Sequence, residues 1–203
     1  LPAALAIELF HNFTLIHDDI MDKAQLRRGE KTVHEKWDNN IAILSGDTML
    51  VQAFDFISQV EDKNLRKILE VFNKAATEVC EGQQWDMNFE EREDITISDY
   101  LKMIEYKTAV LLATSLQIGS INAGASIEQQ NHMYDFGKNI GIAFQLKDDL
   151  LDAFGDPDIF GKQVGGDIKA NKKTYLYLKA LELANESQKK QLLFLFSEEN
   201  ENK

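Results

Sequence analysis

Two short acidic clusters have the residue types and spacing to hold a metal ion. The first, DDIMD, runs from Asp18 to Asp22, and the second, DDLLD, runs from Asp148 to Asp152. Residues four positions apart share one face of an α-helix, so each cluster places its first and last carboxylates together. Like charges at this spacing destabilise a helix unless a cation offsets them. Magnesium suits the clusters, because it takes carboxylate oxygens and completes its shell with water and substrate phosphates.

A single DDxxD segment on a helix is most often a solvated acidic face. The repetition argues against that reading. Each cluster follows a largely apolar run, FTLIH or IAFQL, and each precedes a loop that is rich in glycine and basic residues. We therefore predict two acidic helix ends that face each other across a helical bundle and hold a diphosphate group through metal ions.

Basic residues follow both clusters. Arg27 and Arg28 lie one short loop after the first, and guanidinium groups match the geometry of phosphate oxygens. Lys162 and Lys172 lie in the loop after the second. Lys107 lies within an apolar helix, where it either binds phosphate or extends its amine to solvent. Cations at these positions can turn a diphosphate into a good leaving group.

Helical periodicity covers almost the whole chain. The apolar spacing predicts helices over residues 3–22, 39–60, 64–88, 97–123, 127–154, 173–185 and 187–197. The two long loops, 23–36 and 155–172, each follow an acidic helix end. The predicted fold class is all-α, a single-domain bundle of long helices around a central cavity.

Composition narrows the functional classes. The chain has 203 residues, enough for one domain, and a net charge of −12, which argues against a nucleic-acid partner. It has no run of eighteen apolar residues, so we expect no transmembrane helix and no stable membrane anchor. Its single cysteine, Cys80, permits no internal disulfide, and we expect a cytoplasmic protein.

Together the motifs resemble those of the trans-isoprenyl diphosphate synthases, the polyprenyl synthetase family of farnesyl and geranylgeranyl diphosphate synthases. LIHDDIMD with LRRG is similar to the family's first aspartate-rich motif, and GIAFQLKDDLLD is similar to the second. AILSGD, EGQQWD, KTA, FGK and GGDIKANKKT resemble further family blocks. The resemblance covers nearly all of the chain and implies the isoprenoid synthase fold, a homodimer, and Mg²⁺-dependent head-to-tail condensation of isopentenyl diphosphate with an allylic diphosphate. The implied product is a short-chain prenyl diphosphate, geranylgeranyl or farnesyl.

The resemblance also implies roles for single residues. Asp18, Asp22 and Asp148 would hold three Mg²⁺ ions on the allylic diphosphate, with Asp152 acting through water. The residues implied to bind substrate or to act in catalysis are Arg27, Arg28, Gln83, Asp86, Lys107, Thr108, Gln145, Lys162 and Lys172.

Among these, Arg27, Lys107 and Lys162 would grip the allylic diphosphate and Arg28 would face isopentenyl diphosphate. Thr108 and Gln145 would offer oxygens to the allylic cation, although Gln145 could instead satisfy a backbone group of its helix. Gln83 and Asp86 would lie in the pocket near the metals. Lys172 matches the lysine of the active-site lid better than Lys173, and His17 is read as a packed histidine rather than a ligand.

Phe13 lies five residues before Asp18, and the resemblance makes it the floor of the hydrocarbon pocket. Helical spacing alone puts Thr14 nearer to the Asp18 face, so ordinary core packing of Phe13 stays open. A small Thr14, with no insertion in DDIMD, is more similar to the geranylgeranyl pattern than to the farnesyl pattern.

The family's Gly-Lys-Arg block for isopentenyl diphosphate does not occur before the first motif. We therefore expect residues 1–203 to form an isoprenoid synthase domain without the family's N-terminal helices and part of its C-terminus. Two alternatives remain: a terpene cyclase, which usually has a different second metal motif, and a non-catalytic subunit of a heteromeric synthase, which usually loses one acidic motif.

Overall fold

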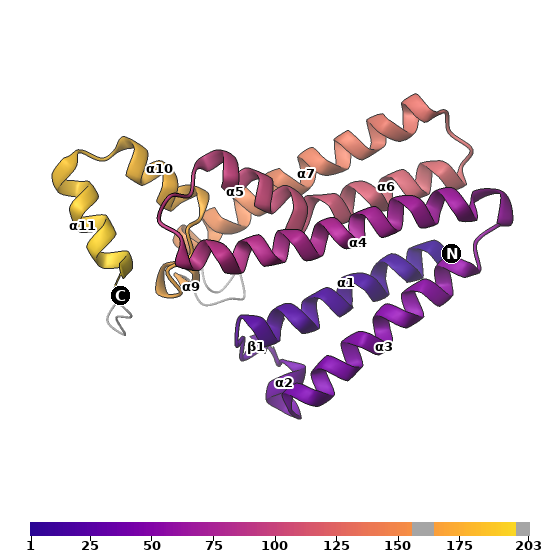
Figure 1. Ribbon diagram of the computed structural model, residues 1–203, viewed down its shortest axis with the longest axis horizontal. Coiled ribbons are helices and arrows are strands. Elements are labelled where there is room, and N and C mark those ends of the chain that lie inside the picture. The colour runs from indigo at the N-terminus through magenta and orange to yellow at the C-terminus, as the bar shows by residue number, and fades with distance from the viewer. Residues whose placement is uncertain (156–164, 198–203) are drawn as a thin grey trace. The chain divides into compact units, whose positions relative to one another are not determined.

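The computed structural model describes residues 1–155 and 165–197, and nearly all of them are helical (Figure 1). Strands β1 (Leu26–Arg27) and β2 (Glu30–Lys31) form one small hairpin. The helices are α1 (Pro2–Met21), α2 (Val33–Lys36), α3 (Asn39–Ser58), α4 (Asp62–Glu91), α5 (Ile97–Ile104), the π-helical turn η1 (Glu105–Ala109), α6 (Val110–Asn122), α7 (Ile127–Phe154), α9 (Gly166–Lys169), α10 (Tyr175–Leu183) and α11 (Glu186–Ser197). The predicted all-α class is confirmed.

The sequence predicts one domain, whereas contacts within the chain divide it into two compact units. The first unit comprises Leu1–Thr77 and Val110–Lys138, and the second comprises Glu78–Ala109 and Asn139–Lys203. Helices α4 and α7 each contribute one part to each unit. The first acidic cluster therefore belongs to the first unit, and the second cluster belongs to the second.

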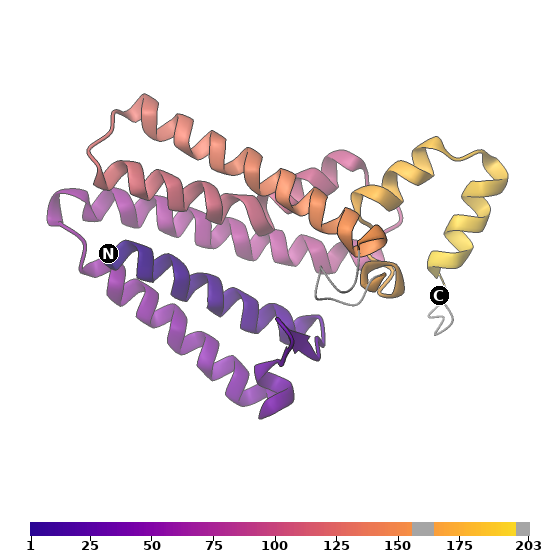
Figure 2. The same ribbon diagram turned by 180° about the vertical axis from the view of Figure 1, so that it is seen from behind.

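In the first unit, α1 and α3 pack along each other, and both views of the ribbon show them side by side (Figures 1 and 2). The buried apolar residues of α1 recur every three or four positions and include Phe10 and Phe13. The ring of Phe10 lies 5.6 Å from that of Phe13 and 5.4 Å from that of Phe72, between centroids. This aromatic packing anchors the helix whose last turn carries the first acidic cluster.

A close approach of α1 and α3 occurs at Gly46. A Cβ atom at this position would lie 2.4 Å from Nε2 of His17, so a larger residue would require the His17 ring to move. The His17 ring packs against Phe13 at 4.7 Å between centroids, and its Nε2 lies 3.2 Å from the carbonyl oxygen of Ile43. These are the contacts of a packed histidine.

The loop after the first cluster contains a hairpin that side-chain alternation does not reveal, because each strand has only two residues. Arg27 pairs with Glu30 across it. The two residues between them, Arg28 and Gly29, both have positive φ angles, 54° and 81°. Positive φ at both central positions is typical of two-residue hairpin turns, and Gly29 adopts it without strain.

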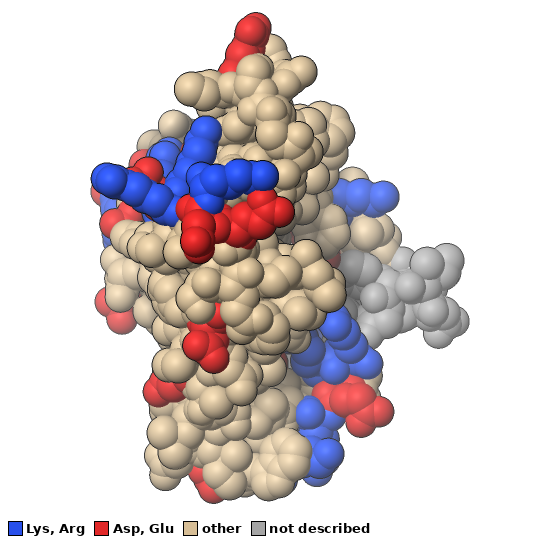
Figure 3. Space-filling model, turned by 90° about the vertical axis from the view of Figure 1, so that its right-hand side faces the viewer, with Lys and Arg blue, Asp and Glu red and all other residues tan. Residues whose placement is uncertain are grey.

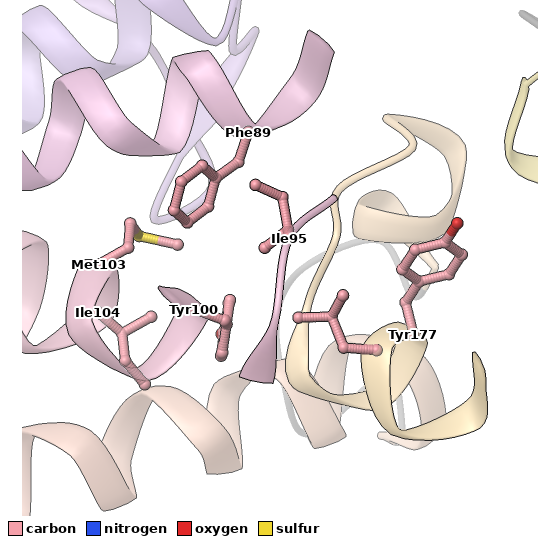
Figure 4. Close-up of a cluster of buried hydrophobic side chains, with 7 residues drawn as sticks. Phe89, Ile95, Tyr100, Met103, Ile104 and Tyr177 are labelled. Atoms are coloured by element: carbon pink, nitrogen blue, oxygen red, sulfur yellow. The ribbon is translucent and has the colours of Figure 1, made fainter. Parts of the chain in front are cut away.

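In the second unit, seven buried side chains form a hydrophobic core that joins the end of α4 to α5 and α10 (Figure 4). They are Phe89, Ile95, Tyr100, Met103, Ile104, Tyr177 and Leu178. The chain enters α5 through a capping box, in which the Thr96 side chain accepts from the Asp99 amide and the Asp99 side chain accepts from the Thr96 amide. The core and the cap together fix the start of the helix that leads into η1.

The π-helical turn η1 interrupts a segment that the sequence predicts to be one continuous helix. A Cβ atom on Gly82 of α4 would lie 2.2 Å from the backbone nitrogen of Lys107 in η1. A Cβ atom on Gly141 of α7 would lie 2.5 Å from Cα of Ala109. The widened turn therefore fits between two helices only because each presents a glycine.

The surface concerns two predictions, that the chain has no nucleic-acid partner and that it has no transmembrane helix. On the face shown in Figure 3, basic side chains border acidic ones, so its charge is mixed. Among the described residues, only α3 has the length and hydropathy to cross a membrane, with a mean hydropathy of 1.3. A core helix of a soluble protein meets the same criterion, so this observation is weak evidence for a membrane span.

Candidate active site

The first acidic cluster occupies the last turn of α1. The amide of Asp22 donates to the carbonyl of Asp18 at 2.8 Å, so the helical spacing of the two residues is kept where the helix ends. The C-terminus of a helix carries partial negative charge, and a carboxylate there costs about 0.3–1 kcal/mol. A cation offsets both this cost and the mutual repulsion of Asp18 and Asp22, so the donor set and its place on the helix fit Mg²⁺.

Asp19, the middle acid of the cluster, has a different environment. It is 4% exposed, and its Oδ1 accepts from Nε of Arg27 at 2.9 Å and from Nη2 at 2.6 Å. Nη2 also lies 3.4 Å from Oδ2 of Asp18. Burial opposes the charge on Arg27, but the bond to Asp19 and the fields of the nearby aspartates outweigh it and raise the pKa of the guanidinium. Asp19 thus fixes a permanent cation beside the cluster, a role that its sequence position did not reveal.

Arg28, the next residue, lies on the wall of a cavity of about 170 Å³ in the first unit. Lys31 adds a second cation to this wall, and Leu15, Ile16 and Val33 add apolar surface. Cations beside apolar side chains suit a small ligand with an anionic head and a hydrocarbon tail. The predicted substrate residue Arg28 therefore lies in a suitable environment.

The second acidic cluster occupies the last two turns of α7, in the second unit. The chain returns to it after the undescribed residues 156–164: the amide of Gly165 donates to the carbonyl of Asp152 at 2.6 Å, and the amide of Asp167 donates to Oδ2 of Asp152 at 3.0 Å. Burial, together with the charge of Asp152, raises the pKa of Asp167 to about 6. Carboxylates are thus crowded at this helix end, as they are at a cation site.

Asp86 of α4 brings two of the predicted lysines together. Its Oδ2 lies 2.6 Å from Nζ of Lys107 and 3.9 Å from Nζ of Lys172. Gln83, the other predicted residue of this helix, lies one turn before Asp86 and is half-buried. Lys107 is held by a carboxylate within the second unit, so it does not simply extend to solvent.

Thr108 and Gln145 also meet within the second unit. Oγ1 of Thr108 donates to Oε1 of Gln145 at 3.2 Å, and Nε2 of Gln145 donates to Oδ1 of Asp149 at 3.0 Å. Asp149 is 4% exposed and also accepts from the hydroxyl of Tyr100. Burial raises the pKa of Asp149, although the bonds from Tyr100 and Gln145 act in the opposite direction. Gln145 thus bonds side chains rather than a backbone group.

The contacts of Lys173 differ from those of Lys172, which is predicted to be the lysine of the lid. Nζ of Lys173 donates to backbone carbonyls at and beyond the end of α4, those of Phe89 at 2.9 Å, Glu90 at 3.1 Å, and Arg92. This use of the ammonium group is structural. Lys162 lies outside the described residues.

Within residues 1–155 and 165–197, no group of three or more acidic, histidine or cysteine side chains could hold a metal ion. Each cluster offers two helical carboxylates, Asp18 with Asp22 and Asp148 with Asp152. Mg²⁺ is commonly bound in this way, through one or two carboxylates with water and substrate phosphates as its other ligands.

Comparison with known proteins agrees with these features. Residues 1–203 match the family model described as polyprenyl synthetase. The chain belongs to the polyprenyl synthetase family. It is 47% identical to the geranylgeranyl diphosphate synthase of Methanosarcina mazei over 184 residues, which cover 90% of this chain and 57% of that protein. The predicted resemblance of the motifs to those of isoprenyl diphosphate synthases is thereby confirmed.

Two solved structures are also similar. A geranylgeranyl pyrophosphate synthase superimposes with a TM-score of 0.94 at 52% identity, over 100% of this chain and 61% of that one. A polyprenyl synthase from Caulobacter crescentus, complexed with calcium and isoprenyl diphosphate, superimposes with a TM-score of 0.79 at 29% identity, over 97% of this chain and 64% of that one. The chain thus spans about three fifths of the length of the relatives it matches.

Proposed function

We propose that the full-length protein condenses isopentenyl diphosphate with an allylic diphosphate, head to tail, and releases a short-chain prenyl diphosphate. The relatives named above as geranylgeranyl diphosphate synthases support geranylgeranyl diphosphate as the product. The reaction needs an allylic diphosphate that ionises, a cation that is protected from water, and a proton acceptor. The proposed acceptor is the departing diphosphate.

In this proposal Asp18, Asp22, Asp148 and Asp152 hold Mg²⁺ ions on the allylic diphosphate. Bound Mg²⁺ would neutralise charge on the leaving diphosphate. The complex of the Caulobacter protein with calcium and isoprenyl diphosphate is consistent with a divalent cation beside such a substrate.

The protein's own cations complete the binding of diphosphate. Arg27, Lys107, Lys162 and Lys172 grip the allylic diphosphate, and Arg28 faces isopentenyl diphosphate. Fixed cations stabilise negative charge as it develops on the leaving group, and they need no reorganisation during the reaction. Arg27 is suited to this role because Asp19 already holds its guanidinium in place.

One observation carries the proposal: the π-helical turn places Lys107 beside Asp86 and Lys172, and the next residue, Thr108, beside Gln145. Residues of η1, α7 and the segment before α10 thus supply cations for diphosphate and neutral oxygens for a carbocation, and Asp86 of α4 holds the two lysines. This combination is what an ionising allylic diphosphate requires.

The test is turnover by the full-length protein with labelled isopentenyl diphosphate, Mg²⁺ and primers of five, ten or fifteen carbons. We expect a labelled geranylgeranyl product, sized by chromatography, and no product when Mg²⁺ is chelated. Absence of any elongated product with all three primers would refute the proposal. We also propose that the enzyme is a cytoplasmic homodimer, which sedimentation of the full-length protein and cell fractionation would test.

A further inference from the structure

Asp149 is the one acid of the second cluster that is buried, at 4% exposure, and the proposed metal binding does not use it. It accepts hydrogen bonds from three directions: the Tyr100 hydroxyl of α5, the Gln145 amide one turn earlier on α7, and the backbone amide of Tyr175 at the start of α10. Tyr100 itself lies among the buried apolar side chains of the second unit (Figure 4). A carboxylate held by three rigid elements has a fixed position.

The chemistry of these groups fixes the direction of each hydrogen bond. An ionised carboxylate only accepts, so the group of Gln145 that faces Asp149 must be its NH₂. The carbonyl oxygen of Gln145 must then point the other way, where it accepts the proton of the Thr108 hydroxyl. The lone pairs of Thr108 Oγ1 are left directed away from Gln145. Two neutral oxygens, Oε1 of Gln145 and Oγ1 of Thr108, therefore lie next to each other, and each keeps a lone pair that their mutual hydrogen bond does not use.

We propose that Asp149 is a positioning residue that orients Gln145 and Thr108 so that both present oxygen, and not a donor hydrogen, to the allylic cation. This inference rests on the proposed function, because it assumes that a carbocation forms beside Thr108 and Gln145. It explains why a buried acid lies next to a metal-binding acid without sharing its role.

The inference predicts what happens when the direction of these hydrogen bonds is reversed. In Asp149→Asn the single carbonyl oxygen can take the place of Oδ2 and accept from Tyr100, and the new NH₂ then takes the place of Oδ1 and faces Gln145. Gln145 must turn its own carbonyl toward that NH₂, which directs its amide hydrogens at Thr108 and the cation. A dipole of the wrong sign then opposes the charge that develops in the transition state.

The decisive experiment exchanges the two groups in the double variant Asp149→Asn/Gln145→Glu. The carboxylate that this variant places on α7 accepts from the new NH₂ with one oxygen, and its other oxygen again accepts from Thr108. We expect kcat of Asp149→Asn to fall about 10²-fold, the size typical of one lost transition-state contact. The allylic KM and the Mg²⁺ dependence should stay within about threefold. The double variant should recover at least about tenfold in kcat over Asp149→Asn.

A second readout does not depend on activity. The side-chain amide protons of Gln145, assigned by their absence in Gln145→Glu, should exchange slowly with solvent in the wild-type protein and faster in Asp149→Asn. Ser126→Ala, which removes a capping hydroxyl at the opposite end of α7 from Gln145, is the control for a general loss of stability. Its kcat should equal that of the wild-type protein.

An Asp149→Asn variant with wild-type kcat would overturn the inference, and so would a double variant that recovers nothing. A loss confined to KM would also overturn it, since that indicates a binding defect and not a misdirected dipole. A wild-type protein with a protected Gln145 amide but no product would refute the proposed function, and this inference with it, without refuting the hydrogen bonds.

Discussion

Gly82→Ala tests whether the π-helical turn η1 depends on backbone contact with α4. The added Cβ atom would lie 2.2 Å from the Lys107 nitrogen, 2.7 Å from its Cα and 2.7 Å from the carbonyl carbon of Tyr106. All three are backbone atoms, so no change of rotamer can relieve the contact. An ordinary contact of at least 3.4 Å requires η1 or α4 to move by roughly 1.2 Å, the difference between 3.4 and 2.2 Å.

The expected cost follows from this displacement. Overpacking of a core typically costs about 1–3 kcal/mol, and a backbone clash belongs at the upper end of that range. Replacing a helical glycine by alanine raises the free energy of unfolding by about 1 kcal/mol, because alanine has the higher helix propensity. The net loss in the free energy of unfolding should therefore be about 2 kcal/mol. Because Lys107 and Thr108 move with η1, kcat should also fall, by up to about 10²-fold for a shift of about 1 Å.

Gly119→Ala is the matched control, because Gly119 is an exposed glycine of α6 whose added Cβ would meet nothing within 4 Å. It should stabilise the protein by about 0.5–1 kcal/mol and leave kcat unchanged. The measurements are urea unfolding of the full-length protein, checked for two-state behaviour, and turnover at saturating substrate. If Gly82→Ala gained stability as Gly119→Ala does, the reasoning about the turn would be wrong.

Four further substitutions test other parts of the molecule. Asp148→Ala should lower kcat about 10²-fold or more, because Mg²⁺ loses a ligand, and near-normal turnover would contradict the two-cluster model. Phe13→Ala should lengthen the products, at a cost of about 3–5 kcal/mol at most in the free energy of unfolding, and Thr14→Phe should shorten the products. Chromatography measures product length, and an unchanged length in Phe13→Ala would mean that Phe13 serves only as a core residue. Hydrogen bonds from Thr96 lower the pKa of Asp99, so this carboxylate stabilises the fold above its unfolded pKa near 4 and loses that effect as the pH falls through the lower folded value. Melting curves should therefore show Asp99→Asn about 1 kcal/mol less stable than wild type at pH 7 and a smaller difference at pH 2, whereas a constant difference would argue against the cap.

The long helices could be predicted because their periodicity is sustained and their ends are marked. The predicted helix over 127–154 coincides with α7, and the predicted 39–60 differs from α3 by two residues at its end. The interruption at η1 could not be predicted. It depends on contacts with Gly82 and Gly141, which lie on other helices, and the side chains of the turn remain compatible with a regular helix.

The candidate site also has parts that the sequence predicts and parts that it does not. Pairs on one helix, such as Asp148 with Asp152, follow from helical geometry alone. Lys107 meets Asp86 from 21 positions away, and Thr108 meets Gln145 from 37 positions away. Only the family resemblance placed these residues in one pocket, because no local pattern encodes contacts between helices. Asp19 and Asp149 received no role in the sequence prediction, since burial cannot be read from a run of acids.

The two acidic clusters share a pattern of burial, in which the second acid is buried and the first and last acids are not. The second acid of each, Asp19 or Asp149, is 4% exposed and bonds to the protein itself, Asp19 to Arg27 and Asp149 to Gln145. The first and last acids share a helical face and are more exposed. Asp19 thus fixes a cation that suits diphosphate, and Asp149 fixes oxygens that suit a carbocation. We therefore propose that adjacent aspartates recur because one residue of each pair faces the ligand and the next, about 100° further round the helix, secures the group that assists it.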